Sequence, residues 1–265
     1  MRFSEKVLLA TGGASGIGAA TARRFTAEGG RVAILDLDVE QAEALAEELP
    51  GAVAIATDIT DEQGVRAAVD RAVATLGGVD CALTAAGFVD FGPIEELSVE
   101  RWNRVLAVHL TGTFLTCKHA APVLRRRGGG SIATVASVAA LVAQPTDSPG
   151  ATPEEVTPSH NAAYGAAKAA VLGFSRHLAR DLARDRIRVN ALAPGSVRTP
   201  MTTKLYTLRG GGSYATGAGW SALTNPQRRV AEPAEIAAAA CFLFSDDAAF
   251  VTGHTLVCDG GQVVT

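Results

Sequence analysis

Short runs of apolar and β-branched residues alternate with longer alanine-rich stretches along most of the chain. The first run, KVLLAT at 6–11, is apolar without alternating, which is typical of a strand buried on both faces. Strands that alternate with helices predict a parallel sheet covered by helices on both sides. The chain is therefore predicted to be an α/β protein with a doubly wound parallel sheet.

Six further strands are predicted, which makes about seven in all. They lie at 31–36, 52–58, within 79–87, at 131–137, at 187–194 and at 255–261. Helices are predicted at 19–29, 39–49 and 62–77. Nothing resembles a linker, so residues 1–265 are predicted to form a single domain.

Two segments interrupt the alternation and are predicted to be surface loops. The first, 143–161, contains four prolines, and the second, 207–220, is rich in glycine. We expect the first to border the substrate site and a wider region, 200–225, to form a lid over it.

Composition excludes several classes of function. Net charge is −3 and the densest basic run is only three residues, at 125–127, which argues against binding to nucleic acid or an acidic membrane. No apolar stretch approaches the roughly 18 residues of a membrane span. The cysteines, Cys81, Cys117, Cys241 and Cys258, form no CxxC pair. We expect buried free thiols, no metal site and a cytoplasmic location.

A glycine cluster, TGGASGIG at 11–18, lies between the first strand and the first helix. Gly12, Gly16 and Gly18 leave room for the backbone to approach a pyrophosphate, and a helix N-terminus offers unpaired N–H groups. A turn that merely connects two elements is the alternative. The strand before the cluster, the helix after it and a carboxylate at the end of the next strand favour a Rossmann-like dinucleotide site.

That carboxylate is Asp36, at the position expected for contact with an adenine ribose. A carboxylate there accepts hydrogen bonds from both ribose hydroxyls and repels a 2′-phosphate, which favours NAD over NADP. Asp36 could instead cap the following helix, a role open to Asp38 as well. Asp58, at the end of the third strand, could bind the adenine edge or cap a helix.

Tyr164 and Lys168 are four residues apart in HNAAYGAAKAA, so on a helix they share one face. A free phenol has a pKa near 10, and a nearby ammonium lowers it. The small residues between them allow this face to pack closely against a cofactor. Taken alone, the pair could equally be a half-buried tyrosine and a surface lysine.

The chain resembles the short-chain dehydrogenase/reductase family along nearly its whole length. The resemblance rests on TGGASGIG, Asp36, YGAAK, RVNALAPGSVRTPM and the closing GHTLVCDGG, in the order found in that family. It implies an NAD-dependent oxidoreductase that interconverts a secondary alcohol and a ketone by hydride transfer.

The resemblance also implies roles for individual residues. Tyr164 is the general acid/base, Lys168 lowers its pKa and holds the nicotinamide ribose, and Ser137 binds the substrate oxygen. The cofactor-binding residues it implies are Gly12, Ser15, Gly16, Ile17, Gly18, Asp36, Asp58, Ile59, Ala86, Gly87, Tyr164, Lys168, Pro194, Gly195, Val197 and Thr199.

The chain departs from the family pattern in three places. The usual NNAG is TAAG at 84–87, which removes two side-chain amides. The usual asparagine of VNLTGTF is His109, which we expect to join the proton path from Tyr164 through Lys168, with simple packing as the alternative. The segment between Ser137 and Tyr164 is roughly twice the family's usual length, and long for a loop in a compact domain.

The resemblance places the substrate near 88–94, the proline-rich loop and the region after Pro200. Candidate apolar lining residues there suggest an apolar or cyclic alcohol: Phe88, Phe91, Leu141, Val142, Tyr206 and Trp220. Arg198 or Arg209 could bind a carboxylate. A homotetramer is expected, with contacts near 102–125 and 164–182. A carbonyl reductase working in the opposite direction and a catalytically silent NAD-binding protein remain alternatives.

Overall fold

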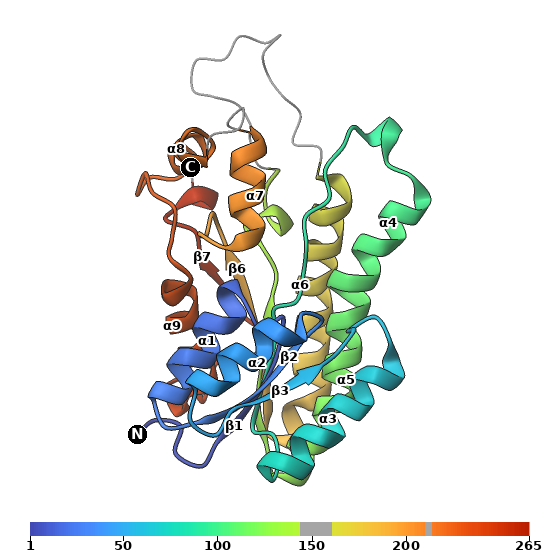
Figure 1. Ribbon diagram of the computed structural model, residues 1–265, viewed down its shortest axis with the longest axis vertical. Helices are drawn as coiled ribbons and strands as arrows, with labels where there is room; N and C mark the ends of the chain where they lie inside the picture. Colours follow the sequence, from blue (N-terminus) through green and yellow to red (C-terminus); the bar gives the residue numbers. More distant parts are fainter. Residues whose placement is uncertain (144–160, 210–213, 265) are drawn as a thin grey trace.

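The computed structural model describes residues 1–143, 161–209 and 214–264, and it contains one seven-stranded sheet (Figure 1). Every strand pair is parallel, in the order β3-β2-β1-β4-β5-β6-β7. The strands are β1 (Val7–Thr11), β2 (Arg31–Asp36), β3 (Val53–Ala56), β4 (Cys81–Thr84), β5 (Gly130–Val135), β6 (Ile187–Pro194) and β7 (Thr255–Cys258). The predicted doubly wound parallel sheet is confirmed.

Helices cover both faces of this sheet, as the uninterrupted apolar strands require. Leu8 and Ala10 of β1 pack in one cluster, whereas Val7 and Leu9 pack in the cluster on the opposite face. The first face carries α1 (Gly16–Ala27), α2 (Val39–Glu48) and α9 (Pro233–Phe244). The second carries α3 (Glu62–Leu76), α5 (Gly112–Arg126) and α6 (Ala162–Leu182). β1 therefore buries both sets of its side chains, whereas β3 and β7 at the two edges of the sheet are less buried.

The carboxylates that begin the helices are distinct from those that the sequence assigns to the cofactor. The Asp38 side chain caps α2 by accepting from the Gln41 amide, and Asp61 caps α3 by accepting from the Gln63 and Gly64 amides. Asp36 and Asp58 are therefore not needed as caps for these helices.

The strand order reverses between β1 and β4, which lie side by side although two strands separate them in sequence. Crossovers on the two sides of this point lead to opposite faces, so a crevice forms at the carboxyl ends of the strands. In Figure 1 this edge is the upper end of the sheet, where α7 (Pro200–Arg209) follows β6.

The structure corrects one predicted loop. Residues 207–220 were expected to form a glycine-rich surface loop, but α7 extends to Arg209 and α8 spans Tyr214–Leu223. Gly217 explains the difference, because a Cβ there would lie 1.9 Å from the Tyr206 carbonyl oxygen. Glycine is thus required for α8 to pack against α7, and this packing outweighs its low helix propensity. Most of the other predicted loop, 144–160, lies outside the described residues.

The helix before β5 is divided. It consists of α4 (Val99–Leu106), a π-helical turn (Ala107–Thr111) and α5. The π-helical turn contains His109, which is buried. Within the described residues, no helix is long and apolar enough to cross a membrane.

Candidate active site

A cavity of about 360 Å³ opens at the carboxyl ends of the strands near the β1/β4 reversal. The ends of β2, β5 and β6 and the segments that follow β1, β3 and β4 line it, together with residues of α4 and α6. Every residue predicted for catalysis or cofactor binding lines this cavity except Gly18. The fold thus gathers residues spread over nearly 190 positions of sequence around one space.

The glycine turn forms the floor of the cavity at the start of α1. Gly12 and Gly16 adopt positive φ angles of 61° and 52°, where other residues are strained. A Cβ on Gly12 would lie 2.5 Å from Ala86 on the neighbouring strand end. A Cβ on Gly18 would lie 2.0 Å from the Gly12 carbonyl oxygen, so Gly18 supports the turn rather than lining the cavity.

The N-terminus of α1 faces the same cavity through Ser15, Gly16 and Ile17. The Ser15 side chain makes no capping hydrogen bond, and the first turn holds no acidic residue. The first amides of α1 and the positive end of its dipole are therefore available to an anion such as a pyrophosphate. These features fit the phosphates of a dinucleotide.

Asp36 is held at the end of β2 by two backbone amides. Its carboxylate accepts from the Ala14 amide at 3.0 Å and from the Asp38 amide at 3.1 Å. These bonds join the carboxylate directly to the glycine turn. No lysine or arginine lies among the lining residues contributed by the glycine turn and the ends of β2 and β3. The Asp36 carboxylate thus has no positively charged side chain beside it in this part of the cavity lining.

Asp58 lies near Asp36, just beyond β3. Its carboxylate accepts from both the amide and the hydroxyl of Thr60, at 2.8 and 2.7 Å. The Thr60 hydroxyl is the largest cause that lowers the pKa of Asp58. Asp58 is therefore ionised and oriented by its own loop.

Ser137 and Tyr164 meet where α6 crosses the end of β5. Ser137 precedes a short 3-10 turn (Val138–Ala140), and its hydroxyl accepts from the Ala139 amide at 3.1 Å. It is also hydrogen-bonded to the Tyr164 hydroxyl. A Cβ on Gly165 would lie 3.3 Å from the Ala139 carbonyl oxygen. The small residue after Tyr164 therefore allows α6 to approach the turn that carries Ser137.

Lys168 lies one helical turn beyond Tyr164 and is buried. Its Nζ donates to the Val135 carbonyl oxygen at 2.6 Å and lies 5.7 Å from the centre of the Tyr164 ring. Burial lowers the pKa of Lys168 to about 7. The ammonium is thus fixed against the end of β5, and its proton is unusually easy to remove.

The pKa of Tyr164 is raised in this structure, mainly by burial. The hydrogen bond with Ser137 opposes this shift, and Tyr206 adds to it. Lys168 is not among these causes, so a pKa of Tyr164 lowered by Lys168 is not observed in this arrangement. The Ser137 hydrogen bond is the interaction that favours the phenolate here.

His109 lies in the π-helical turn, edge-on to Tyr164, with ring centres 5.1 Å apart. Its Nε2 lies 2.7 Å from the Phe88 carbonyl oxygen, whereas its buried Nδ1 has no partner within the described residues. Burial, reinforced by Lys168, lowers the pKa of His109 to about 3. The imidazole is therefore neutral near pH 7, with Nε2 as the donor and Nδ1 as a free acceptor. A role in proton transfer stays a prediction, now restricted to the neutral ring.

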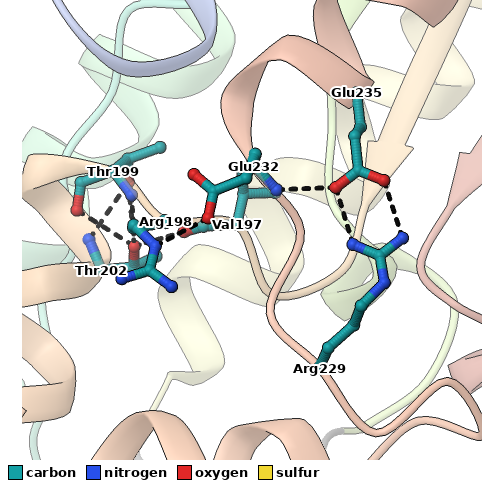
Figure 2. A network of polar contacts seen from close by, with 7 residues as sticks. All are labelled: Val197, Arg198, Thr199, Thr202, Arg229, Glu232 and Glu235. Carbon is teal, nitrogen blue, oxygen red and sulfur yellow. Dashed lines mark hydrogen bonds and ion pairs between the residues drawn. The ribbon is translucent and has the colours of Figure 1, made fainter. Parts of the chain in front are cut away.

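The turn after β6 closes the cavity with Pro194, Gly195, Val197 and Thr199. Figure 2 shows how it is fixed: the Thr202 hydroxyl bonds with Val197 and Thr199. A parallel bridge joins Val197 to Ala231. Both sides of this turn are therefore held by hydrogen bonds.

Arg198 does not line the cavity. Its Nε donates to the Glu232 carboxylate at 2.9 Å (Figure 2). The expectation that Arg198 could bind a substrate carboxylate therefore conflicts with the structure. The side chain of Arg209 lies outside the described residues.

Of the predicted apolar lining residues, only Phe88 lines the cavity. Phe91, Leu141, Val142 and Tyr206 do not, and Tyr206 is buried with its hydroxyl bonded to Ser221. The side chain of Trp220 is outside the described residues. Lining residues that the sequence reasoning missed include Arg104, Val108, Met201 and Thr202. The sequence carries no clear signal for Arg104, because packing sets which face of α4 meets the cavity and a π-helical turn interrupts the regular helical spacing before Val108 and His109.

Comparison with known proteins agrees with this site. The family model adh_short_C2, described as Enoyl-(Acyl carrier protein) reductase, matches residues 12–262. D-threitol dehydrogenase of Mycolicibacterium smegmatis is 39% identical, over 99% of this chain and 95% of its own. Cis-4-hydroxycyclohexanecarboxylate dehydrogenase of Sinomonas cyclohexanicum is 38% identical, over 98% and 97%. The crystal structure of levodione reductase matches with a TM-score of 0.90 at 31% identity, covering 100% of both chains.

The fold and the cavity define an oxidoreductase that uses a nicotinamide cofactor and interconverts an alcohol and a carbonyl compound. The chain belongs to the short-chain dehydrogenase/reductase family. The predicted family is thereby confirmed.

Proposed function

We propose that this protein is an NAD-dependent dehydrogenase that oxidises a cyclic secondary alcohol to the ketone, with Tyr164 as the general acid/base. The convergence of Ser137, Tyr164 and Lys168 beside a dinucleotide-shaped turn carries this proposal. The NAD nicotinamide, when bound, accepts the hydride from the carbinol carbon. The chain itself must bind the alcohol, orient it and remove its hydroxyl proton.

Tyr164 and Ser137 share that task. Their hydroxyls are hydrogen-bonded to each other, so a substrate oxygen placed between them would meet two hydroxyl groups. Tyr164 takes the proton from the alcohol, while Ser137 orients the substrate oxygen. Ser137 is buried and Tyr164 is half-buried, so a substrate bound between them would meet little competing water and form stronger hydrogen bonds.

Lys168 stands next in the proton path. Its pKa of about 7 means that the amine exchanges protons readily near neutral pH. Its position 5.7 Å from the Tyr164 ring leaves room for a ribose hydroxyl or water between the two groups. In the oxidation, Lys168 would thus accept, through such a bridge, the proton that Tyr164 takes from the alcohol.

Asp36 supports the choice of NAD. It lies at the cavity wall with no cation among the neighbouring lining residues, and a 2′-phosphate there would meet an unopposed carboxylate. The glycine turn and the free amides of α1 would hold the pyrophosphate. Ile59, Ala86 and Val197 supply apolar wall around the rest of the cofactor.

A cyclic substrate is favoured by the relatives named for hydroxycyclohexanecarboxylate and cyclohexadienediol. Phe88, Val108 and Met201 give the cavity apolar surface suited to a ring. A carbonyl reductase with the same residues remains the second candidate, because one site catalyses both directions.

The test is oxidation of a panel of cyclic alcohols, followed by NADH absorbance, with the unmodified protein and Tyr164→Phe. We expect turnover by the unmodified protein and a loss of at least a hundredfold in Tyr164→Phe, since the phenyl ring cannot exchange the proton. NAD binding, measured by calorimetry, should stay within about threefold. Substantial turnover by Tyr164→Phe would contradict the assignment, and no turnover of any alcohol or ketone would favour a silent NAD-binding protein.

A further inference from the structure

The charged residues that line the cavity are unevenly distributed. Asp36 and Asp58 lie at the ends of β2 and β3, and the catalytic candidate Lys168 is buried on α6. The remaining charged residue is Arg104, on α4. It is exposed and lies on the same wall as Phe88 and Val108, within reach of a ligand that enters the cavity.

Two other arginines that the structure describes, Arg101 and Arg198, are engaged by carboxylates, but Arg104 is not. Arg101 forms a two-pronged ion pair with Asp90, and Arg198 pairs with Glu232. Within the described part of the chain, no carboxylate oxygen lies within 4 Å of the Arg104 guanidinium. The charge of Arg104 lowers the pKa of Asp90 less than the hydrogen bond and charge of Arg101 do. Arg104 therefore retains its hydrogen-bond donors for another partner.

The Arg104 guanidinium lies over the ring of Phe88. Its Cζ lies 5.2 Å from the centre of the Phe88 ring, which is the arrangement of a cation–π contact. Such a contact uses the flat face of the guanidinium and leaves the N–H groups along its edge free. Those groups match the two oxygens of a carboxylate.

Phe88 is itself held by His109. The imidazole Nε2 lies 2.7 Å from the Phe88 carbonyl oxygen, and the two rings are stacked with centres 5.6 Å apart. His109 also contacts Tyr164, so one chain of contacts runs from the proton-exchanging hydroxyl to the guanidinium. Contacts through Phe88 and His109 thus connect the Arg104 guanidinium to Tyr164 at the reacting end of the cavity.

We propose that Arg104 binds a carboxylate on the substrate, so that the preferred substrate is a cyclic secondary alcohol that also carries an acid group. This inference rests on the proposed function and adds the substrate class to it. The apolar wall would contact the ring, Ser137 and Tyr164 the hydroxyl, and Arg104 the carboxylate. A cofactor phosphate is the other anion that could reach Arg104, and the experiment separates the two.

The experiment compares cis-4-hydroxycyclohexanecarboxylate with its neutral carboxamide, which has the same ring and hydroxyl. Unmodified protein, Arg104→Met, Arg104→Lys and the control Arg71→Met are assayed with varied substrate at saturating NAD. The KM for NAD is then measured separately with each substrate. Arg71 is exposed on α3 and does not line the cavity. We expect Arg104→Met to lower kcat/KM about tenfold or more for the carboxylate, mainly through KM, and less than about twofold for the carboxamide. Arg104→Lys should restore part of the loss, and Arg71→Met should match the unmodified protein.

A binding measurement accompanies the kinetics. Calorimetry with cyclohexanecarboxylate and cyclohexanecarboxamide reports the same contact without turnover. We expect Arg104→Met to weaken binding of the carboxylate by about tenfold and to leave the affinity for the carboxamide unchanged.

Equal effects on the acid and the amide, or no effect on either, would overturn the inference while leaving the proposed function intact. A rise in KM for NAD that is the same with both substrates would assign Arg104 to a cofactor phosphate, which also overturns it. If the unmodified protein oxidised neither alcohol, the proposed function would fail for these substrates, and the calorimetric comparison would still decide whether Arg104 binds a carboxylate.

Discussion

Replacing Lys168 with methionine should make the cofactor-free protein more stable while abolishing its activity. Methionine fills a similar volume without placing an ammonium in the interior. In the folded protein burial lowers the pKa of Lys168 from 10.5 to about 7. Each pKa unit corresponds to about 1.4 kcal/mol, so burying the charged form costs up to about 5 kcal/mol. The lost bond to the Val135 carbonyl offsets part of that gain.

The pH dependence gives a sharper measure than the absolute gain. In the unfolded chain Lys168 keeps its proton up to about pH 10.5, whereas in the folded protein it releases it from about pH 7 upward. The unfolded state therefore binds more protons across this window, so the stability of the unmodified protein rises with pH relative to Lys168→Met. Between pH 7 and pH 9 the difference in unfolding free energy should shrink by about 2 kcal/mol.

Urea unfolding at pH 7, 8 and 9, at one fixed protein concentration, measures this change. Lys118→Met is the matched control, because Lys118 is an exposed lysine on α5 paired with Glu62. Its stability relative to the unmodified protein should change little over this range. A difference between unmodified protein and Lys168→Met that stays constant from pH 7 to pH 9 would refute the reasoning.

Three further predictions concern the cofactor, the relay and assembly. Asp36→Asn should narrow the preference for NAD over NADP, measured as the ratio of their dissociation constants; equal affinities in the unmodified protein would contradict this assignment. His109→Leu should slow turnover at least tenfold, and a tenfold loss is equivalent to about 1.4 kcal/mol of barrier, whereas His109→Asn should keep most activity. An unchanged turnover rate for His109→Leu from pH 6 to pH 9 would leave packing as the role of His109. Light scattering at micromolar concentration should give the mass of a tetramer, and a monomer mass would exclude that assembly.

Much of the fold could be predicted because the apolar runs have clear ends. The observed bounds of β2 and β6 equal the predicted ones. Each of these apolar runs is followed directly by a segment that contains polar residues or glycine. The third strand is shorter than predicted and ends at Ala56, because its partner β2 ends at Asp36, which pairs with Ala56. Residues 57 and 58 instead form the loop that orients the Asp58 carboxylate.

The parts of the site that could not be predicted depend on tertiary packing. AVHLT has no residue that is incompatible with an α-helix, so the π-helical turn around His109 leaves no sequence signal. Arg104 lines the cavity because α4 presents that face toward Phe88, which a list of helical residues does not determine. Glycines at 217 and 219 indicated a loop, although close packing of α8 on α7 requires one of them.

The bond between Asp36 and the Ala14 amide has a consequence for changing the cofactor by design. The carboxylate expected to discriminate between two cofactors also holds the glycine turn. A substitution that only removes its charge by truncation would leave the Ala14 amide without its acceptor and loosen the turn for both cofactors. A useful NADP variant must therefore keep an oxygen acceptor at position 36 and add its cation elsewhere, with position 37, an exposed leucine at the cavity wall, as the nearest place for it.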